Sequence, residues 1–213
     1  MNKKDKVKEI LKLLGREYGN AECTLEYETP LQLLIATCLA AQCTDARVNI
    51  VTKELFLKYR NVNDFANANQ AELEQDIKST GFYKNKAKNI ISACNTMLSN
   101  FNGNVPDNMD DLLTLAGVGR KTANLILGEI FGKRAIVVDT HCTRLTNRIG
   151  LTKNKDATKI EFDLGKIIEP KNQLLFCHLM VAHGRSICRA RNPLCDKCGI
   201  NFLCNFRRNG LKD

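Results

Sequence analysis

The stretch L-A-G-V-G-R-K-T-A, residues 115–123, joins two helical segments through a short glycine turn. Leucines precede the turn, and apolar residues continue around most of the helix that follows it, over 121–131. Gly117 and Gly119 permit positive φ and a close backbone approach, so amide N–H groups can point at a phosphate. The positive end of the following helix adds to such an anion site. We expect a helix–hairpin–helix over about 109–131 that binds a DNA backbone; the alternative is a tight turn used only for packing.

Helical periodicity extends outward from this hairpin along almost the whole chain. The sequence predicts helices over residues 4–18, 30–39, 45–59, 70–79, 84–100, 109–115, 121–131, 141–149, 155–168 and 171–184. The β-branched run A-I-V-V at 135–138 could form a strand, but no partner strands are evident. We therefore expect an extended lead-in to a helix that Asp139 caps. The predicted fold class is all-α.

Lys121 stands in the first turn of the second hairpin helix, where the helix dipole disfavours a positive charge. That field, with any desolvation, favours the neutral amine that a nucleophile requires. Such an amine could attack a sugar C1′, displace the base and leave a Schiff base. Asp139 is the candidate carboxylate for stabilising the developing sugar cation. Two alternatives remain open: Lys121 as a phosphate contact or solvated charge, and Asp139 as a helix cap alone.

Four cysteines near the C-terminus are spaced C-x6-C-x2-C-x5-C within residues 188–204. Four thiols this close in sequence can all bind one inorganic centre. We expect that centre to be an iron–sulfur cluster. Zinc is the alternative, although structural zinc sites usually join two close ligand pairs and only Cys195 and Cys198 form one. The other cysteines are scattered in mostly apolar surroundings and are expected to be small core residues. They are Cys23, Cys38, Cys43, Cys94, Cys142 and Cys177.

The chain of 213 residues carries a formal net charge of +9. This positive charge favours a polyanionic binding partner. The alternative is a basic surface that only keeps the protein soluble. Arg185, Arg189 and Arg191 gather beside the cysteine loop, where they would present positive charge to phosphates. The sequence has no apolar run long enough to cross a membrane and no secretory segment at its start. We therefore expect a cytoplasmic protein.

Five stretches together resemble the endonuclease III family closely, over essentially the whole chain. They are A-Q-C-T-D at 41–45, G-F-Y at 81–83, the hairpin at 115–123, V-D-T-H at 138–141 and the four-cysteine loop. The resemblance implies a two-lobed helix-hairpin-helix DNA glycosylase fold with a C-terminal 4Fe-4S cluster loop. A helical barrel lobe would span 23–133, and a cluster lobe would combine 1–22 with 134–213.

The resemblance also implies the reaction and the partner. The chain would be a bifunctional DNA glycosylase and AP lyase that removes oxidised pyrimidines from double-stranded DNA. It would cleave the resulting abasic site by β-elimination, as a nucleoid-associated monomer. A non-catalytic iron–sulfur DNA-binding module and a mismatch-specific monofunctional glycosylase are the alternatives. Mismatch enzymes that act on thymine typically carry tyrosine where Lys121 stands, which favours the lyase.

By this likeness Lys121 is the Schiff-base nucleophile and Asp139 the essential carboxylate. Cluster ligands are expected at Cys188, Cys195, Cys198 and Cys204. Gln42 would fill the gap left by a flipped nucleotide, and Phe82 would wedge the duplex. Judged on residue type alone, Gln42 would be an exposed loop residue and Phe82 a core residue. Further DNA contacts are expected at Gly117, Gly119, Arg120, His141, Arg144, Arg185 and Arg191.

Two residues depart from the family pattern, and two histidines fall outside it. The family usually has leucine where Phe82 stands, which could change lesion preference. It usually has proline where Ala116 stands, so the hairpin is slightly looser. His178 and His183 lie in an amphipathic segment and are expected to pack in the interior or at an interface.

Overall fold

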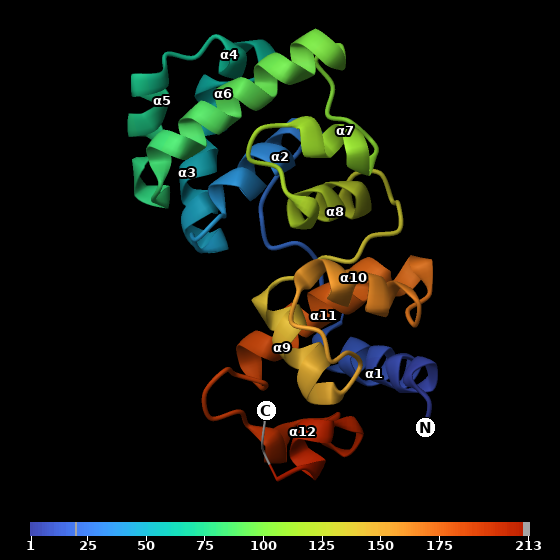
Figure 1. Cartoon of the computed structure of the whole chain (residues 1–213). Helices are drawn as coiled ribbons and strands as arrows, with labels where there is room; N and C mark the ends of the chain where they lie inside the picture. Colours follow the sequence, from blue (N-terminus) through green and yellow to red (C-terminus); the bar gives the residue numbers. More distant parts are fainter. Residues whose placement is uncertain (20, 211–213) are drawn as a thin grey trace. The chain divides into compact units, whose positions relative to one another are not determined.

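The computed structural model describes residues 1–19 and 21–210, and this part of the chain is helical with no strand (Figure 1). It forms two compact units. The central unit is Cys23–Gly132, and the terminal unit combines Met1–Glu22 with Lys133–Asp213. The chain leaves the central unit one residue earlier than the position expected from the sequence. Within the described residues, no helix has both the length and the apolar character needed to cross a lipid bilayer.

The central unit is built around α6 and α8. Its elements are α2 (Pro30–Leu39), α3 (Asp45–Lys58), α4 (Val62–Ala66), α5 (Gln70–Asp76), the 3-10 turn η1 (Lys78–Thr80), α6 (Tyr83–Asn100), α7 (Met109–Thr114) and α8 (Arg120–Glu129). α6 packs on α4 and α5, while α8 packs on α2 and α7 (Figure 1). Leu33, Ile90 and Ile126 are fully buried in this core. The nearly all-round apolar character of α8 therefore reflects a central position.

The terminal unit draws its core from both ends of the chain. Its elements are α1 (Lys3–Tyr18), α9 (Thr140–Ile149), α10 (Ala157–Gly165), η2 (Pro170–Asn172), α11 (Gln173–Ser186), η3 (Cys195–Lys197), η4 (Asn201–Leu203) and α12 (Asn205–Arg208). α11 packs on both α1 and α9. The stripe of Val7, Ile10 and Leu14 on α1 is buried in one core with Leu145 and Met180. Helix α1 thus completes a core whose other members lie more than a hundred residues later.

Polar side chains fix where the helices begin. Thr29 caps α2 and Pro30 occupies its first turn, as the sequence predicts. Asn69 caps α5 by accepting from the Glu72 amide. The structure adds α4, which is too short for a periodic signal and is held by a reciprocal capping box between Asn61 and Asp64.

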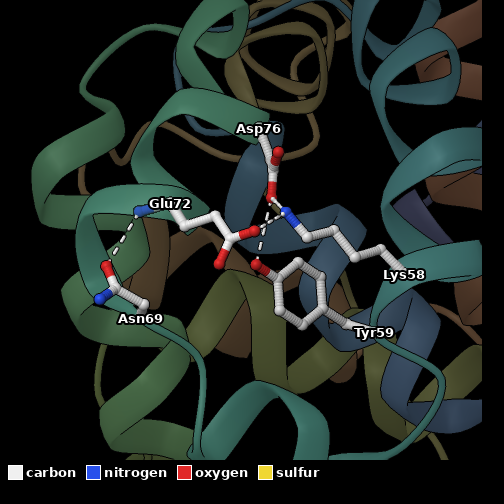
Figure 2. A network of polar contacts seen from close by, with 5 residues as sticks. All are labelled: Lys58, Tyr59, Asn69, Glu72 and Asp76. Atoms are coloured by element: carbon white, nitrogen blue, oxygen red, sulfur yellow. Dashed lines mark hydrogen bonds and ion pairs between the residues drawn. The ribbon is translucent and has the colours of Figure 1, made fainter.

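A surface network joins the end of α3 to α5 (Figure 2). Lys58 Nζ lies 2.7 Å from both Asp76 Oδ2 and Glu72 Oε1. The Tyr59 hydroxyl donates to the same Asp76 oxygen over 3.1 Å. Hydrogen bonds to Asp76 and Glu72 raise the pKa of the Lys58 ammonium. Tyr59 is buried, but the three charged side chains reach solvent, so their ion pairs orient the helix ends more than they stabilise the fold.

Candidate functional site

The turn between α7 and α8 uses its two glycines differently. Gly117 has φ +79°, in the left-handed region, and a Cβ there would lie only 3.0 Å from Asn89 Nδ2. Gly119 has φ −100°, and nothing lies within 4 Å of where its Cβ would be. The expectation that both glycines exploit positive φ is therefore right only for Gly117. Gly119 instead leaves open space beside the first turn of α8.

Lys121 is exposed and is the second residue of α8. Gly119 is the N-cap of this helix, and no side chain among the described residues caps it. The first amide N–H groups of a helix lack carbonyl partners within it, so an uncapped start can receive a phosphate. Arg120 at the first position is half-buried. The helix start thus presents amide donors with an exposed amine beside them.

Gln42 and Phe82 both have left-handed backbones, with φ +56° and φ +50°. Gln42 lies in the link between α2 and α3, and Phe82 immediately precedes α6. Both side chains are exposed, Phe82 to 63%. The core position that residue type alone suggests for Phe82 is therefore wrong. Left-handed φ is uncommon for residues other than glycine, so both loops hold a conformation that tertiary contacts must enforce.

These loops meet the hairpin around one open hollow of the central unit. Its wall combines Gln42, Phe82 and Gly117 with residues from α2 and α6. The α2 and α6 residues are Cys38, Asn85, Lys86 and Asn89, and Ala41 completes the wall. The structure therefore brings together three motifs that are separate in the sequence.

Asp139 belongs to the terminal unit and caps α9. Its Oδ1 accepts from the Cys142 amide over 2.7 Å, and its backbone is extended, as the sequence predicts. The preceding segment is held by a hydrogen bond from the Val137 amide to Cys177 Sγ, 3.2 Å long. The carboxylate is half-buried, and Oδ1 is the oxygen that forms the cap. Capping is compatible with a chemical role.

Arg144 braces the start of the cysteine loop. Its Nη2 donates to the carbonyl oxygens of Cys188 at 2.9 Å and Gly184 at 3.1 Å. It also lies 3.2 Å from His141 Nδ1. Burial lowers the pKa of His141; Arg144 lowers it further, and Asp139 acts in the opposite direction. Arg144 thus bonds to three protein groups, and its DNA contact stays a prediction. The side chains of Arg185 and Arg191 are exposed.

The four loop cysteines line one hollow together with Ile187, Pro193 and Phe206. All four cysteines are half-buried, and none forms a disulfide. Burial raises the pKa of the Cys198 thiol to about 11 and also raises the pKa values of Cys188 and Cys195. Without a metal, burial keeps these thiols protonated. A metal bound here would displace the thiol protons. Four sulfurs around an apolar hollow fit an iron–sulfur cluster by donor chemistry.

No set of three or more His, Cys, Asp or Glu side chains in the described residues is arranged to hold a metal ion directly. Of the scattered cysteines, Cys94, Cys142 and Cys177 are buried as expected. The other three scattered cysteines are half-buried and pack against the core of the central unit, so they lie at its edge. They are Cys23, Cys38 and Cys43.

Sequence reasoning missed two buried cations of the terminal unit: Arg148, which contacts the cysteine loop, and Lys6, which joins α1 to the end of α9. Arg148 is only 6% exposed; it donates to the Arg189 carbonyl over 2.8 Å and lies 4.4 Å above the Phe206 ring. Lys6 reaches from α1 to the Ile149 carbonyl over 3.0 Å. Nothing in the local pattern of charges distinguishes these residues from solvated ones.

The histidines of α11 differ in burial. His183 is 1% exposed; its Nδ1 lies 2.9 Å from the Tyr18 hydroxyl and its Nε2 3.3 Å from Cys198 Sγ. The interior position expected from the sequence is confirmed for His183. His178 is half-buried.

Comparison with known proteins gives a coherent picture. Residues 35–170 match the family model described as HhH-GPD superfamily base excision DNA repair protein. Endonuclease III of Synechocystis sp. is 49% identical over 95% of this chain and 93% of its own length. Endonuclease III of Bacillus subtilis is 41% identical over 93% and 90%. A solved structure of a trapped endonuclease III–DNA covalent intermediate, an estranged-adenine complex, is 40% identical, covers 100% of both chains and has a TM-score of 0.93. The chain therefore belongs to the HhH-GPD superfamily of base excision DNA repair proteins and, within it, to the endonuclease III family.

Proposed function

We propose that this chain is a bifunctional DNA glycosylase and AP lyase that excises oxidised pyrimidines from double-stranded DNA. The observation that carries the proposal is the exposed Lys121 amine at the uncapped start of α8, beside the left-handed turn at Gly117. A relative 40% identical to this chain has been trapped as a covalent intermediate with DNA, which supports an amine nucleophile. A hairpin that only packed two helices would not need an open, uncapped helix start.

The chemistry follows from the residues in their proposed roles. The neutral Lys121 amine attacks C1′ as the bond to the base breaks, and the bond electrons leave with the base, which takes up a proton. The nitrogen gives up its two protons, one that neutralises the departing base and one that goes to O4′ as the C1′–O4′ bond breaks, and the opened sugar is left as an imine. Loss of a C2′ proton then expels the 3′ phosphate by β-elimination. The Asp139 carboxylate stabilises the positive charge that develops on the sugar.

DNA binding is assigned to groups of both units. Amides at Gly117 and Gly119, with Arg120, receive phosphates at the hairpin. Gln42 and Phe82 occupy the space of an extruded nucleotide and wedge its neighbours. Arg185 and Arg191 add charge next to the cysteine loop, and His141 contributes a neutral donor. The protein acts as a monomer on nucleoid DNA in the cytoplasm.

The four cysteines of the terminal unit would hold a 4Fe-4S cluster. Cys188, Cys195, Cys198 and Cys204 are the ligands, with Arg144 and Arg148 bracing the loop through its carbonyl oxygens. When bound, the cluster supplies a rigid crosslink that fixes the loop and its arginines. The reaction needs no electron transfer, because its bond changes balance without an oxidant.

Borohydride trapping tests the nucleophile. Mixed with duplex DNA that contains one abasic site, the protein forms a covalent adduct that survives denaturing electrophoresis. Lys121→Ala forms no adduct, whereas Lys53→Ala, at an exposed lysine of α3, does. Failure of the parent chain to form an adduct, or an adduct with Lys121→Ala, would contradict the proposal. A panel of duplexes with one oxidised pyrimidine or purine each then defines the lesion class.

Metal analysis tests the cofactor. The purified protein is expected to be brown and to contain iron and acid-labile sulfide in equal amounts. Cys198→Ser loses the colour, while Cys23→Ser in the central unit keeps it. A colourless protein with stoichiometric zinc would show that the cluster assignment is wrong.

A further inference from the structure

Lys86 is a buried cation of the central unit that the proposed chemistry does not use. It lies in the first turn of α6 and is 6% exposed. Its Nζ donates to the carbonyl oxygens of Leu39 and Thr80, each over 2.8 Å. No carboxylate among the described residues pairs with it. An ammonium group has therefore been buried against two backbone carbonyls that are far apart in sequence.

The two carbonyls belong to the loops that carry the proposed DNA-entering side chains. Leu39 ends α2, three residues before Gln42. Thr80 ends η1, two residues before Phe82. Carbonyls at a helix end lack amide partners within the helix and attract a cation. The Lys86 side chain thus donates hydrogen bonds to the last carbonyls of both helices and so joins the two loops.

Burial makes this arrangement costly for the charge. It lowers the pKa of Lys86, while the Cys43 and Cys38 sulfurs act in the opposite direction. A buried cation contributes less to stability than a well-packed apolar side chain of similar volume often would. The main effect of Lys86 is therefore on the geometry of the two loops. Gln42 and Phe82 hold left-handed backbone conformations, which surrounding contacts must stabilise.

Resting on the proposed function, we propose that Lys86 is a positioning residue that ties the Gln42 and Phe82 loops into one rigid element for nucleotide extrusion. Lys86 lines the same hollow as Gln42, Phe82 and Gly117. The element therefore extends to the hairpin turn. Without the Lys86 bridge, each loop would lose the shared anchor that sets its spacing from the other.

The test compares two buried lysines. Lys86→Met removes the bridge, and Lys6→Met is the control. Lys6 is 9% exposed and also donates to a helix-end carbonyl, but in the terminal unit. Each variant is assayed for excision of a damaged base from a duplex and for borohydride trapping on a single-stranded abasic oligonucleotide, which needs no extrusion. Fluorescence of 2-aminopurine next to the lesion reports extrusion directly.

Lys86→Met is expected to lower duplex excision by about 10- to 100-fold, the effect of a small misplacement of a positioned group. Its single-strand trapping stays close to that of the parent chain, and its extrusion signal falls. Lys6→Met keeps the parental ratio of the two activities. Equal losses on duplex and single strand, or no loss for Lys86→Met, would overturn the inference. If the parent chain gives no adduct, the proposed function fails instead.

A second variant covers the case in which Lys86→Met does not fold. Lys86→Gln keeps a donor and is combined with the double change Gln42→Ala and Phe82→Ala. If Lys86 acts through these loops, Lys86→Gln lowers duplex excision in the parent chain but hardly at all in the double variant. Equal fold losses in the two backgrounds would refute the positioning role.

Discussion

The carboxylate of Asp139 serves structure and, in the proposed mechanism, chemistry. One oxygen caps α9 through the Cys142 amide. A negative charge at a helix start interacts favourably with the helix dipole. The two roles need different atoms of the same group, and a substitution can therefore separate them.

Asp139→Asn separates the cap from the charge. Asparagine caps helices about as well as aspartate, so the free energy of unfolding should change by less than about 1 kcal/mol. Excision should fall by about 100-fold or more, because the stabilising charge is lost. Asp139→Ala should lose the same activity and about 1 kcal/mol of stability besides. Thermal melts and single-turnover excision check this; full activity in Asp139→Asn would leave the residue only its capping role.

The helix positions of candidate residues could be predicted where a motif marks them, but burial that depends on distant contacts could not. Lys121 and Asp139 stand out because a glycine turn and an apolar run define their helix positions. Lys6, by contrast, bonds a carbonyl 143 residues away. Lys86 and Arg148 likewise satisfy carbonyls of other segments. A lysine or arginine in a polar sequence is read as solvated, since only tertiary structure shows that it is buried.

At the scale of elements, the hairpin divides its tasks between its two glycines. Gly117 supplies the left-handed turn against Asn89. Gly119 starts α8 without a capping side chain. Because Gly119 has no side chain, no side-chain oxygen of the N-cap accepts from the first amide N–H groups of α8. In the proposed function these amides bind a phosphate.

Serine at each position gives opposite results. Gly117→Ser should destabilise the protein by about 1–2 kcal/mol, since a left-handed conformation disfavours a Cβ and Asn89 is in the way. Gly119→Ser should stabilise it slightly, by about 0.3 kcal/mol, because serine is a somewhat better N-cap than glycine. It should nonetheless weaken DNA binding, since its hydroxyl oxygen competes with phosphate for the α8 amides. Denaturant melts and DNA titrations at several salt concentrations measure both effects; tighter DNA binding by Gly119→Ser would contradict the assignment.

Helix positions were mostly predictable, because the apolar stripes and caps are local. The α2 bounds follow from Thr29 and Pro30. The segment expected as one helix over 70–79 instead breaks at Ile77, whose ψ of 7° turns the chain into η1. Helix α4 was missed, since five residues cannot display a period. Short turns of this kind are set by caps and packing, not by periodicity.

On the scale of the molecule, each unit has its own apolar core. Leu14 of α1 belongs to the terminal core and Leu33 of α2 to the central core, and both are fully buried. The all-α class could be predicted from periodicity, and the family from its motifs. The pairing of α1 with α9 and α11 could not be predicted, because an apolar stripe shows which face of a helix is buried but not which helix it packs against.

Core truncations should weaken one unit at a time. Leu14→Ala is expected to cost about 2–5 kcal/mol and to lower amide exchange protection in α9 and α11. Leu33→Ala should have the same cost but should lower protection in α6 and α8. Hydrogen exchange read segment by segment distinguishes the two. Equal loss of protection in both units from either change would mean that they unfold as one.

The placement of α1 also bears on how the chain is made. The central unit is one uninterrupted run of residues, so it can fold as soon as that run has left the ribosome. Helix α1 precedes the central unit in the sequence, whereas its partners α9 and α11 follow that unit. During translation the nascent protein can therefore carry a folded central unit together with an amphipathic helix α1 whose apolar stripe is not yet buried. The four loop cysteines follow α11 in the sequence, so the proposed cluster could be loaded only after the helices of both cores have been synthesised.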